Sequence, residues 1–224
     1  MTDHHNIHAP TIVIPYRDRQ THLDCLLSRL GNFPVIVVEQ QDQLLFNRGA
    51  LLNIGFEQAT SQGAGRVILH DCDLVPDDTL LRMYTEEWPM PIVHFGARFR
   101  RYNNSSKYFG GVHGFTASSF PGYPNHFWGW GGEDDVLRKR VNLRKCTYPR
   151  TGEYLDLEGY YTARDKLNHT PHKLRCQDKY EKIRADDMTQ DNHRKGYPYT
   201  NITWTNRGKV QWGNVLFSDG SREV

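Results

Sequence analysis

Three consecutive acids, Glu133, Asp134 and Asp135, are the residues most suited to chemistry in this chain. They directly follow two tryptophans and three glycines, in the run Trp128-Gly-Trp-Gly-Gly132. Glycine lets the backbone approach a ligand closely, and an indole ring offers a flat apolar face on which a sugar can stack. A carboxylate held against such a wall can have a raised pKa and act as a general base. The alternative is a turn whose acids simply begin a helix, where negative side chains are favoured.

A second pair of acids, Asp71 and Asp73, follows the apolar run 66–70. We expect that run to be a buried strand, and ligands bind at the carboxyl ends of strands in open α/β sheets. Hard carboxylate oxygens suit Mg²⁺ or Mn²⁺, which can bridge a diphosphate. Because two aspartates at this spacing also occur by chance in loops, the position after a strand is what favours a metal or diphosphate site.

Two histidines near the carboxyl end, His169 and His172, are three residues apart. Each imidazole can supply a neutral nitrogen to Mn²⁺. A solvated loop is the competing interpretation, so the spacing alone does not establish a metal site.

Arginines lie where two elements begin or end. The segment 15–20 places Arg17 and Arg19 after the apolar run 11–14, and an arginine fork matches phosphate oxygens. Phe46 and Arg48 come at the start of a predicted helix, where they could contact a nucleobase and a phosphate beside free backbone N–H groups. A solvated helix start and a plain amphipathic helix remain the alternatives.

The elements that would position these residues alternate between strand and helix patterns, which favours an α/β fold with a mostly parallel sheet. The predicted helix 22–30 has leucines at helical spacing and ends at Gly31. In the helix that follows Phe46, the residues expected to share the packed face are Leu51, Leu52, Gly55 and Ala59. The other expected elements are strands at 11–14 (ended by Pro15), 33–38, 66–70 and 91–96, helices starting near 77 and over 136–143, and a terminal hairpin within 197–217.

Composition narrows the class of protein. The 224 residues suit one domain, which we expect to span residues 11–224 after a flexible N-terminus at 1–10. A net charge of +2 implies no nucleic-acid partner, and no apolar run is long enough for a transmembrane segment. The four scattered cysteines favour free thiols and a reducing compartment.

The chain resembles the β-1,4-galactosyltransferase family. Four segments carry the resemblance in order, and together they cover roughly residues 11–143; the segment after about 148 diverges. They are Pro15-Tyr-Arg-Asp-Arg19, Phe46-Asn-Arg48 with Leu51-Leu-Asn-Ile-Gly-Phe56, Asp71-Cys-Asp-Leu74, and Tyr108-Phe-Gly-Gly111 with Phe127-Trp-Gly-Trp-Gly-Gly-Glu-Asp-Asp135.

The resemblance implies a GT-A (Rossmann-like, nucleotide-sugar-binding) fold and a role for each matching residue. Asp134 would be the catalytic base, and Tyr108 would favour galactose over N-acetylgalactosamine. The acceptor-binding residues would be Trp130, Glu133, Asp134 and Asp135. The donor-binding residues would be Pro15, Tyr16, Arg17, Arg19, Phe46, Arg48, Asp71, Tyr108, Gly110 and Trp130. The Mn²⁺ ligands would be Asp73 and His172, with His169 in an accessory position.

The implied reaction is an inverting, Mn²⁺-dependent transfer of galactose from UDP-galactose to a hydroxyl of a saccharide or glycan acceptor, giving a β-linkage of the β-1,4 type. The alternatives are a related transferase that uses UDP-N-acetylgalactosamine and a catalytically silent carbohydrate-binding relative. The lack of a transmembrane run and the divergent segment after about 148 depart from the family pattern. They suggest a soluble, cytoplasmic microbial or viral relative, with a catalytic domain cut from a Golgi-type enzyme as the alternative.

Overall fold

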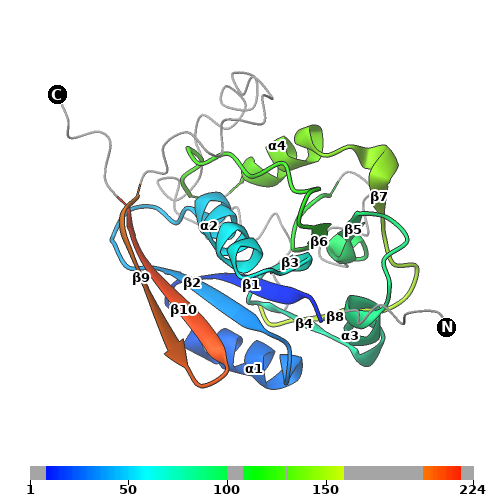
Figure 1. Cartoon of the computed structure of the whole chain (residues 1–224), viewed down its shortest axis with the longest axis horizontal. Helices are drawn as coiled ribbons and strands as arrows, with labels where there is room; N and C mark the ends of the chain where they lie inside the picture. Colours follow the sequence, from blue (N-terminus) through cyan, green and yellow to red (C-terminus); the bar gives the residue numbers. More distant parts are fainter. Residues whose placement is uncertain (1–8, 100–107, 130, 159–198, 218–224) are drawn as a thin grey trace.

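The structure, a computed structural model, describes residues 9–99, 108–129, 131–158 and 199–217. A central sheet lies between two layers of helices (Figure 1). Helix α1 (Gln20–Leu30) covers one face of the sheet, and α2 (Arg48–Ser61) covers the other. The chain therefore forms a single α/β domain with a three-layer core.

The eight-stranded sheet has the order β7-β5-β6-β3-β1-β2-β10-β9. Four of its neighbouring pairs are parallel, including β3-β1, β1-β2 and β2-β10 at its centre, so the expectation of a mostly parallel sheet is confirmed. The strands are β1 (Thr11–Tyr16), β2 (Val35–Gln40), β3 (Arg66–His70), β5 (Ile92–His94), β6 (Val112–Thr116), β7 (Cys146–Thr147), β9 (Tyr199–Arg207) and β10 (Val210–Phe217). A separate two-stranded sheet pairs β4 (Leu74–Pro76) with β8 (Tyr154–Asp156).

Two further α-helices and two 3₁₀ turns complete the described elements. They are α3 (Asp78–Thr85), α4 (Glu133–Arg140), η1 (Phe95–Ala97) and η3 (Leu143–Lys145). The side chain of Asp77 caps α3 by accepting a hydrogen bond from the Leu80 N–H. Capping of this kind satisfies one of the backbone donors that a helix start leaves unpaired.

Alternation along the buried strands builds two cores. On β1, Ile12 and Ile14 face the α1 side, whereas Val13 faces the α2 side. The same alternation holds on β3, where Ile68 packs toward α1 while Val67 and Leu69 pack toward α2. Because successive side chains of a strand point to opposite faces, a strand covered on both sides is apolar throughout.

The structure corrects one predicted strand and adds two strands that were not predicted. The first strand does not end at Pro15: β1 continues through it to Tyr16, because its neighbour β2 pairs with it over this stretch in parallel register. Strands β4 and β6 were not predicted, since their sequences are short and, in β6, interrupted by a glycine. The terminal hairpin is confirmed as β9 and β10, joined at Gly208, and it extends the main sheet next to β2.

The described part of the chain contains no helix that is both long and apolar enough to cross a membrane. Three cysteines within it, Cys25, Cys72 and Cys146, carry free thiols. The predicted flexible segment 1–10 lies almost wholly outside the described residues.

Candidate functional site

The candidate site lies at one edge of the central sheet. Because β1 and β3 are parallel, their carboxyl ends bring the arginine segment after Tyr16 and the acids after His70 to the same edge. Strand β6 runs antiparallel to β3, so its amino end brings Gly110 and Gly111 there as well. The Asp71 N–H donates to the Gly111 carbonyl at 3.1 Å, which joins the two segments directly.

Arg48, at the start of α2, gathers three carboxylates around one guanidinium. Its Nε donates to Asp71 Oδ1 at 2.6 Å, and its Nη1 donates to Asp134 Oδ1 at 3.0 Å. Glu133 Oε1 lies 3.7 Å from the same Nη1. Arg48 and Glu133 are nearly buried and Asp71 and Asp134 partly so, which makes this a shielded cluster with more negative than positive charge.

Two polar atoms of this cluster are left without a partner. Arg48 Nη2 and Glu133 Oε2 are buried, and neither has a hydrogen-bond partner among the described residues. An unpaired buried donor or acceptor costs free energy, so such atoms usually meet a ligand or water. One unpaired donor and one unpaired acceptor in the same cluster suit ligands that carry hydroxyl or phosphate oxygens.

Burial controls the protonation of the acids. The removal of Asp134 from water raises its pKa well above that of an ordinary aspartate, although Arg48 opposes the shift. Burial likewise raises the pKa of Glu133. The Tyr123 hydroxyl also donates to Asp134 Oδ1 at 3.3 Å, and the Tyr123 ring lies 5.4 Å from the Arg48 guanidinium carbon.

The acids do begin a helix, as the alternative interpretation proposed. Glu133, Asp134 and Asp135 form the first turn of α4, preceded by Gly132 at a φ of 99°, a conformation that favours glycine. The first two nevertheless face Arg48, while Asp135 is exposed. The helix start and the site are therefore the same feature.

Gly110 closes the site against Asp134. A Cβ added to Gly110 would lie 2.6 Å from Asp134 Oδ2 and 2.9 Å from the Tyr108 hydroxyl, so only glycine fits. Behind it, His94 Nε2 hydrogen-bonds to the Gly110 carbonyl at 3.1 Å. His94 is buried, and burial lowers its pKa to about 4, so the ring is neutral and donates from Nε2.

Asp73 lies on the other side of the same loop. Its backbone carbonyl accepts a hydrogen bond from the Leu157 N–H at 2.8 Å, and its carboxylate lies 4.0 Å from Arg19 Nη1. The same Arg19 nitrogen pairs with Glu158. Among the described residues no group of three or more potential ligands converges on one metal position, so they offer the Asp73 carboxylate but not a complete shell.

The other predicted donor residues cluster at the end of β1. Arg17 donates to the Leu44 carbonyl at 2.7 Å, and its guanidinium carbon lies 5.3 Å from the centre of the Phe46 ring. Pro15 and Tyr16 are buried in the sheet, with the Tyr16 hydroxyl donating to Gln20 at 3.2 Å. Asp18, between the two arginines, has a φ of 52°, which few non-glycine residues adopt.

Sequence reasoning missed a buried amide ladder that supports the cluster. Asn53 Nδ2 donates to the Tyr123 carbonyl and to Asn125 Oδ1, both at 2.8 Å, and Asn53 Oδ1 accepts from the Tyr123 N–H at 2.8 Å. Asn47 Nδ2 donates to the Asn125 carbonyl at 2.6 Å. An asparagine within the apolar run 51–56 was the available signal, since a buried amide must find partners.

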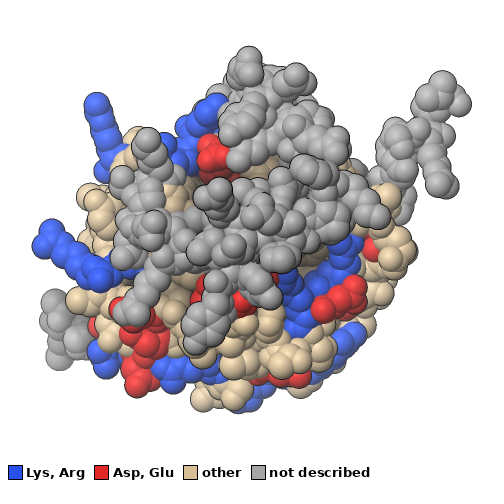
Figure 2. Space-filling model, turned by 180° about the vertical axis from the view of Figure 1, so that it is seen from behind, with Lys and Arg blue, Asp and Glu red and all other residues tan. Residues whose placement is uncertain are grey.

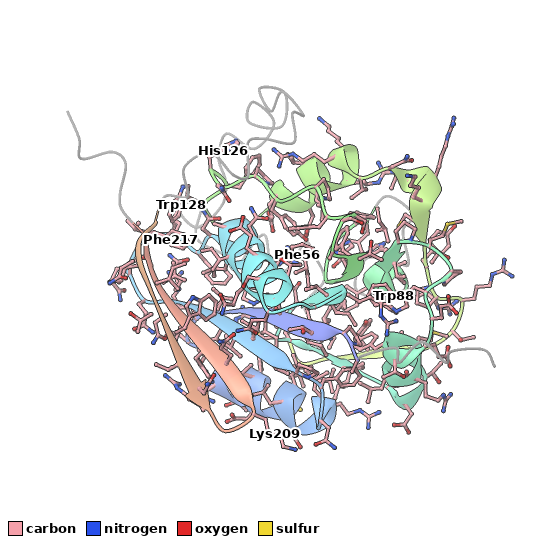
Figure 3. The ribbon with its side chains drawn as sticks, viewed as in Figure 1. Phe56, Trp88, His126, Trp128, Lys209 and Phe217 are labelled. Carbon is pink, nitrogen blue, oxygen red and sulfur yellow. The ribbon has the colours of Figure 1, made fainter. Side chains whose placement is uncertain are left out.

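The tryptophan-rich loop is tied to its surroundings just before residue 130. The Gly129 N–H donates to the Phe46 carbonyl at 2.9 Å, and the Trp128 ring packs edge-on against Phe217 of β10 at 5.3 Å (Figure 3). Trp130, His169 and His172 lie outside the described residues, so their predicted roles stay predictions.

Comparison with known proteins identifies the family. The model of the N-terminal region of glycosyl transferase group 7 matches residues 2–85, and that of the N-terminal domain of galactosyltransferase matches residues 91–173. The chain is 36% identical over 174 residues to beta-1,4-galactosyltransferase 4 of Cricetulus griseus and of Homo sapiens, which covers 70% of the chain and 49% of each relative. It is 39% identical over 169 residues to beta-1,4-galactosyltransferase 6 of Mus musculus, covering 67% of the chain and 44% of that relative.

Solved structures agree on the fold. The catalytic domain of Drosophila beta1,4galactosyltransferase 7, in complex with xylobiose, superposes with a TM-score of 0.69 at 24% identity, and 93% of each chain is covered. A mutant of that enzyme in complex with manganese, UDP-Gal and xylobiose gives a TM-score of 0.68 at 22% identity, again over 93% of each chain. The chain spans about half the length of the curated relatives it matches. On its sequence and its GT-A fold, the chain belongs to the β-1,4-galactosyltransferase family.

Proposed function

We propose that this chain is an inverting, Mn²⁺-dependent galactosyltransferase that moves galactose from UDP-galactose to a hydroxyl of an acceptor saccharide, with formation of a β-1,4 linkage. The observation that carries the proposal is the cluster at Arg48. It offers a carboxylate with a raised pKa together with one unpaired buried donor and one unpaired buried acceptor. The relatives, named as β-1,4-galactosyltransferases, support the choice of sugar.

Asp134 acts as the general base in this proposal. A base works best when its pKa lies near the operating pH, and burial moves Asp134 in that direction. Oδ1 is held by Arg48 and Tyr123, whereas Oδ2 faces the open Cα of Gly110. The acceptor hydroxyl gives its proton to this carboxylate as its oxygen attacks the anomeric carbon. Glu133, with Oε2 unpaired, binds a neighbouring acceptor hydroxyl.

The donor occupies the side of the site at the ends of β1 and β3. Arg17 and Arg19 supply positive charge that binds the diphosphate, and the Phe46 ring offers an apolar face for the nucleobase of the donor. Arg48 uses its unpaired Nη2 for the same ligand. Tyr108, beside Gly110, contacts the sugar and favours galactose; a larger pocket there would suit UDP-N-acetylgalactosamine, the alternative donor.

Asp73 is the residue that fits a divalent cation, because its carboxylate supplies hard oxygen ligands and lies beside Arg19 on the donor side. His172, with His169 accessory, is the proposed nitrogen ligand. Bound Mn²⁺ supplies Lewis-acid neutralisation of the leaving diphosphate.

Trp130 is proposed to cover the donor and the acceptor, and Asp135 to line the acceptor side. The catalytic domain is proposed to span residues 11–224 and to work in a reducing, cytoplasmic setting.

The test is donor turnover by the purified chain, across UDP-galactose, UDP-N-acetylgalactosamine, UDP-glucose and UDP-N-acetylglucosamine, with Mn²⁺ or with chelator. The acceptor panel includes β-xylosides, because the Drosophila relative was solved with xylobiose. We expect Mn²⁺-dependent consumption of UDP-galactose. Preference for another donor would refute the role of Tyr108, and equal turnover in chelator would refute the metal.

Asp134→Asn tests the assignment of the general base, because it removes the basic carboxylate while keeping the shape of the side chain. We expect transfer to fall by about 100- to 10,000-fold, which is the usual contribution of a positioned base, with UDP affinity retained. Retained transfer would remove Asp134 from the role of base. Glycan binding without turnover of any donor would favour the silent binding relative instead.

A further inference from the structure

A run of basic residues leads away from the acceptor acids. Between Asp135 and Glu153 the chain contains six basic residues and no acid. We call them the basic strip: Arg138, Lys139, Arg140, Arg144, Lys145 and Arg150. The whole chain has 28 basic and 26 acidic residues, so the rest of the molecule carries more acids than bases. Six bases without an acid make this segment strongly positive.

The backbone of the strip is held in place. Its first three bases form the last turn of α4, and Asn142 fixes the next turn by accepting hydrogen bonds from the N–H groups of Arg144 and Lys145. At the far end, Arg98 donates to the Arg150 carbonyl at 2.7 Å. The backbone that carries these side chains is thus held by hydrogen bonds at both ends.

The last three bases of the strip are open to solvent. Arg144, Lys145 and Arg150 are exposed, and none of them makes an ion pair with an acid in the part of the chain that the structure describes. Leu143 and Tyr148, among these bases, are 46% and 66% exposed. Seen from behind, Lys and Arg side chains project from the side of the molecule where α4 and β7 lie, at the upper left (Figure 2). A surface of this composition can bind anions through the arginines and stack a ring on the tyrosine.

Helix α4 connects the strip to the acceptor acids. Its first turn contains Glu133 and Asp134, and its last turn contains Arg138 and Arg140. At 1.5 Å per residue, its eight residues span about 12 Å. A saccharide bound at the first turn that extends along the helix therefore passes from acidic to basic surface.

We propose that the acceptor is an anionic saccharide whose terminal residue is neutral and whose inner residues carry carboxylate, sulfate or phosphate groups. This inference rests on the proposed function, whose acceptor it specifies. The acids of the site repel an anionic terminal sugar, since like charges at short distance disfavour binding. The basic strip attracts negative charge further along the same chain.

The test compares two acceptors with the same neutral terminal residue, one of them bearing an acidic group on an inner residue. Both are assayed with UDP-galactose at low and high salt. One variant carries Arg144→Gln, Lys145→Gln and Arg150→Gln. A matched control carries Arg82→Gln, Arg207→Gln and Lys209→Gln, which neutralises three exposed bases elsewhere.

We expect wild-type kcat/KM to be about tenfold higher for the anionic acceptor at low salt, as three weak exposed charge pairs together allow, and the advantage to shrink as salt rises. The strip variant loses this advantage, yet it turns over the neutral acceptor within twofold of wild type. The control variant keeps the advantage. Equal kcat/KM for the two acceptors in wild type, or an advantage that survives in the strip variant, would overturn the proposal.

A binding measurement separates this inference from the proposed function. If neither acceptor is turned over with any donor, the proposed function fails. Fluorescence anisotropy with the labelled anionic oligosaccharide then shows whether the basic strip binds an anionic saccharide. Binding that is lost in the strip variant but not in the control supports the inference. Tighter binding of duplex DNA or of anionic lipid vesicles through the same residues would overturn it.

Discussion

The two helices that cover the central sheet differ in how much of themselves they bury. Helix α1 buries Leu23, Leu26 and Leu30 and exposes most of its other residues. Helix α2 buries eight consecutive residues, from Gly49 to Phe56, so its first two turns are enclosed all round. The first is an amphipathic cover, and the second is a core element.

The polar residues of the two helices differ accordingly. On α1 the charged side chains reach solvent, as in the pair of Arg29 with the exposed Asp78. On α2 the polar groups are enclosed and bonded: Asn53 holds the segment around Tyr123, and Arg48 holds the acids of the site. Helix α2 therefore couples the stability of the fold to the geometry of the site, whereas α1 contributes stability alone.

The largest expected difference between the helices comes from their arginines. Arg48→Met leaves Asp71, Glu133 and Asp134 together without a counter-charge. We expect kcat/KM to fall by about 100- to 1,000-fold, the loss typical when a preorganised electrostatic contact is removed. The unfolding free energy should also fall by about 3 kcal/mol, because carboxylates are left buried and unpaired. Steady-state kinetics and urea unfolding measure the two effects.

Arg29→Met is the matched control on α1. It removes a hydrogen bond to the Pro76 carbonyl and an ion pair with an exposed partner. We expect a loss of about 1 kcal/mol or less and unchanged kcat/KM. Comparable losses of activity in the two variants would abolish the distinction between the helices.

The next prediction concerns the amide ladder. Asn53→Leu keeps the size of the side chain but leaves three buried polar groups of Tyr123 and Asn125 without their partner. We expect a loss of about 3 kcal/mol from the three hydrogen bonds that Asn53 no longer makes, and lower kcat even in the folded fraction because the segment that leads to the acids shifts. Leu26→Ala on α1 should cost a similar 2–5 kcal/mol with kcat unchanged. If both variants keep wild-type kcat when folded, the ladder is structural only.

A smaller effect is expected from the glycine that lets α2 approach the sheet. A Cβ added to Gly55 would lie 2.2 Å from Val13 Cγ1 and 2.9 Å from Val38 Cγ2. Gly55→Ala should therefore destabilise the fold by about 1–2 kcal/mol, since overpacking outweighs the helix propensity of about 1 kcal/mol that alanine adds. Cys25→Ala, at an exposed position of α1, should stay within about 0.5 kcal/mol in the same thermal unfolding measurement. A stabilised Gly55→Ala variant would contradict the close packing.

The same contrast explains which elements could be predicted. The leucines of α1 have a helical period, so its extent was predicted to within two residues at its start. The packed face of α2 was also predicted, as Leu51, Leu52, Gly55 and Ala59 are all buried. The burial of its remaining faces was not predicted. The periodicity of one segment does not reveal that another segment, here residues 120–127, packs against it.

For the site, residue type and position along the chain singled out Asp71, Glu133 and Asp134, but not the residue that joins them. Arg48 was assigned to phosphate, and its contacts with Asp71 and Asp134 cross 23 and 86 positions of sequence. Tyr123, His94 and Glu158 carried no local signal. Contacts of this kind follow from the strand order, which short patterns do not specify.

The smallest expected effect, a pH dependence, tests the charge balance around Arg48. Burial raises the folded-state pKa of Glu133 above the unfolded value of about 4.3. Between those two values the folded state binds more protons than the unfolded state, so the stability that Glu133 contributes falls as pH rises through this window. Glu133→Gln removes the titration. We expect the variant to be more stable than wild type by about 1 kcal/mol at pH 8, with the difference vanishing near pH 4.

Asp135→Asn removes a charge from the same turn at an exposed position, so it separates this effect from that of the helix start. Urea unfolding at both pH values measures the difference. If the unfolding free energies of Glu133→Gln and wild type differed by the same amount at both pH values, Arg48 would neutralise Glu133 fully. The cluster would then hold one counter-charge more than its described contacts supply.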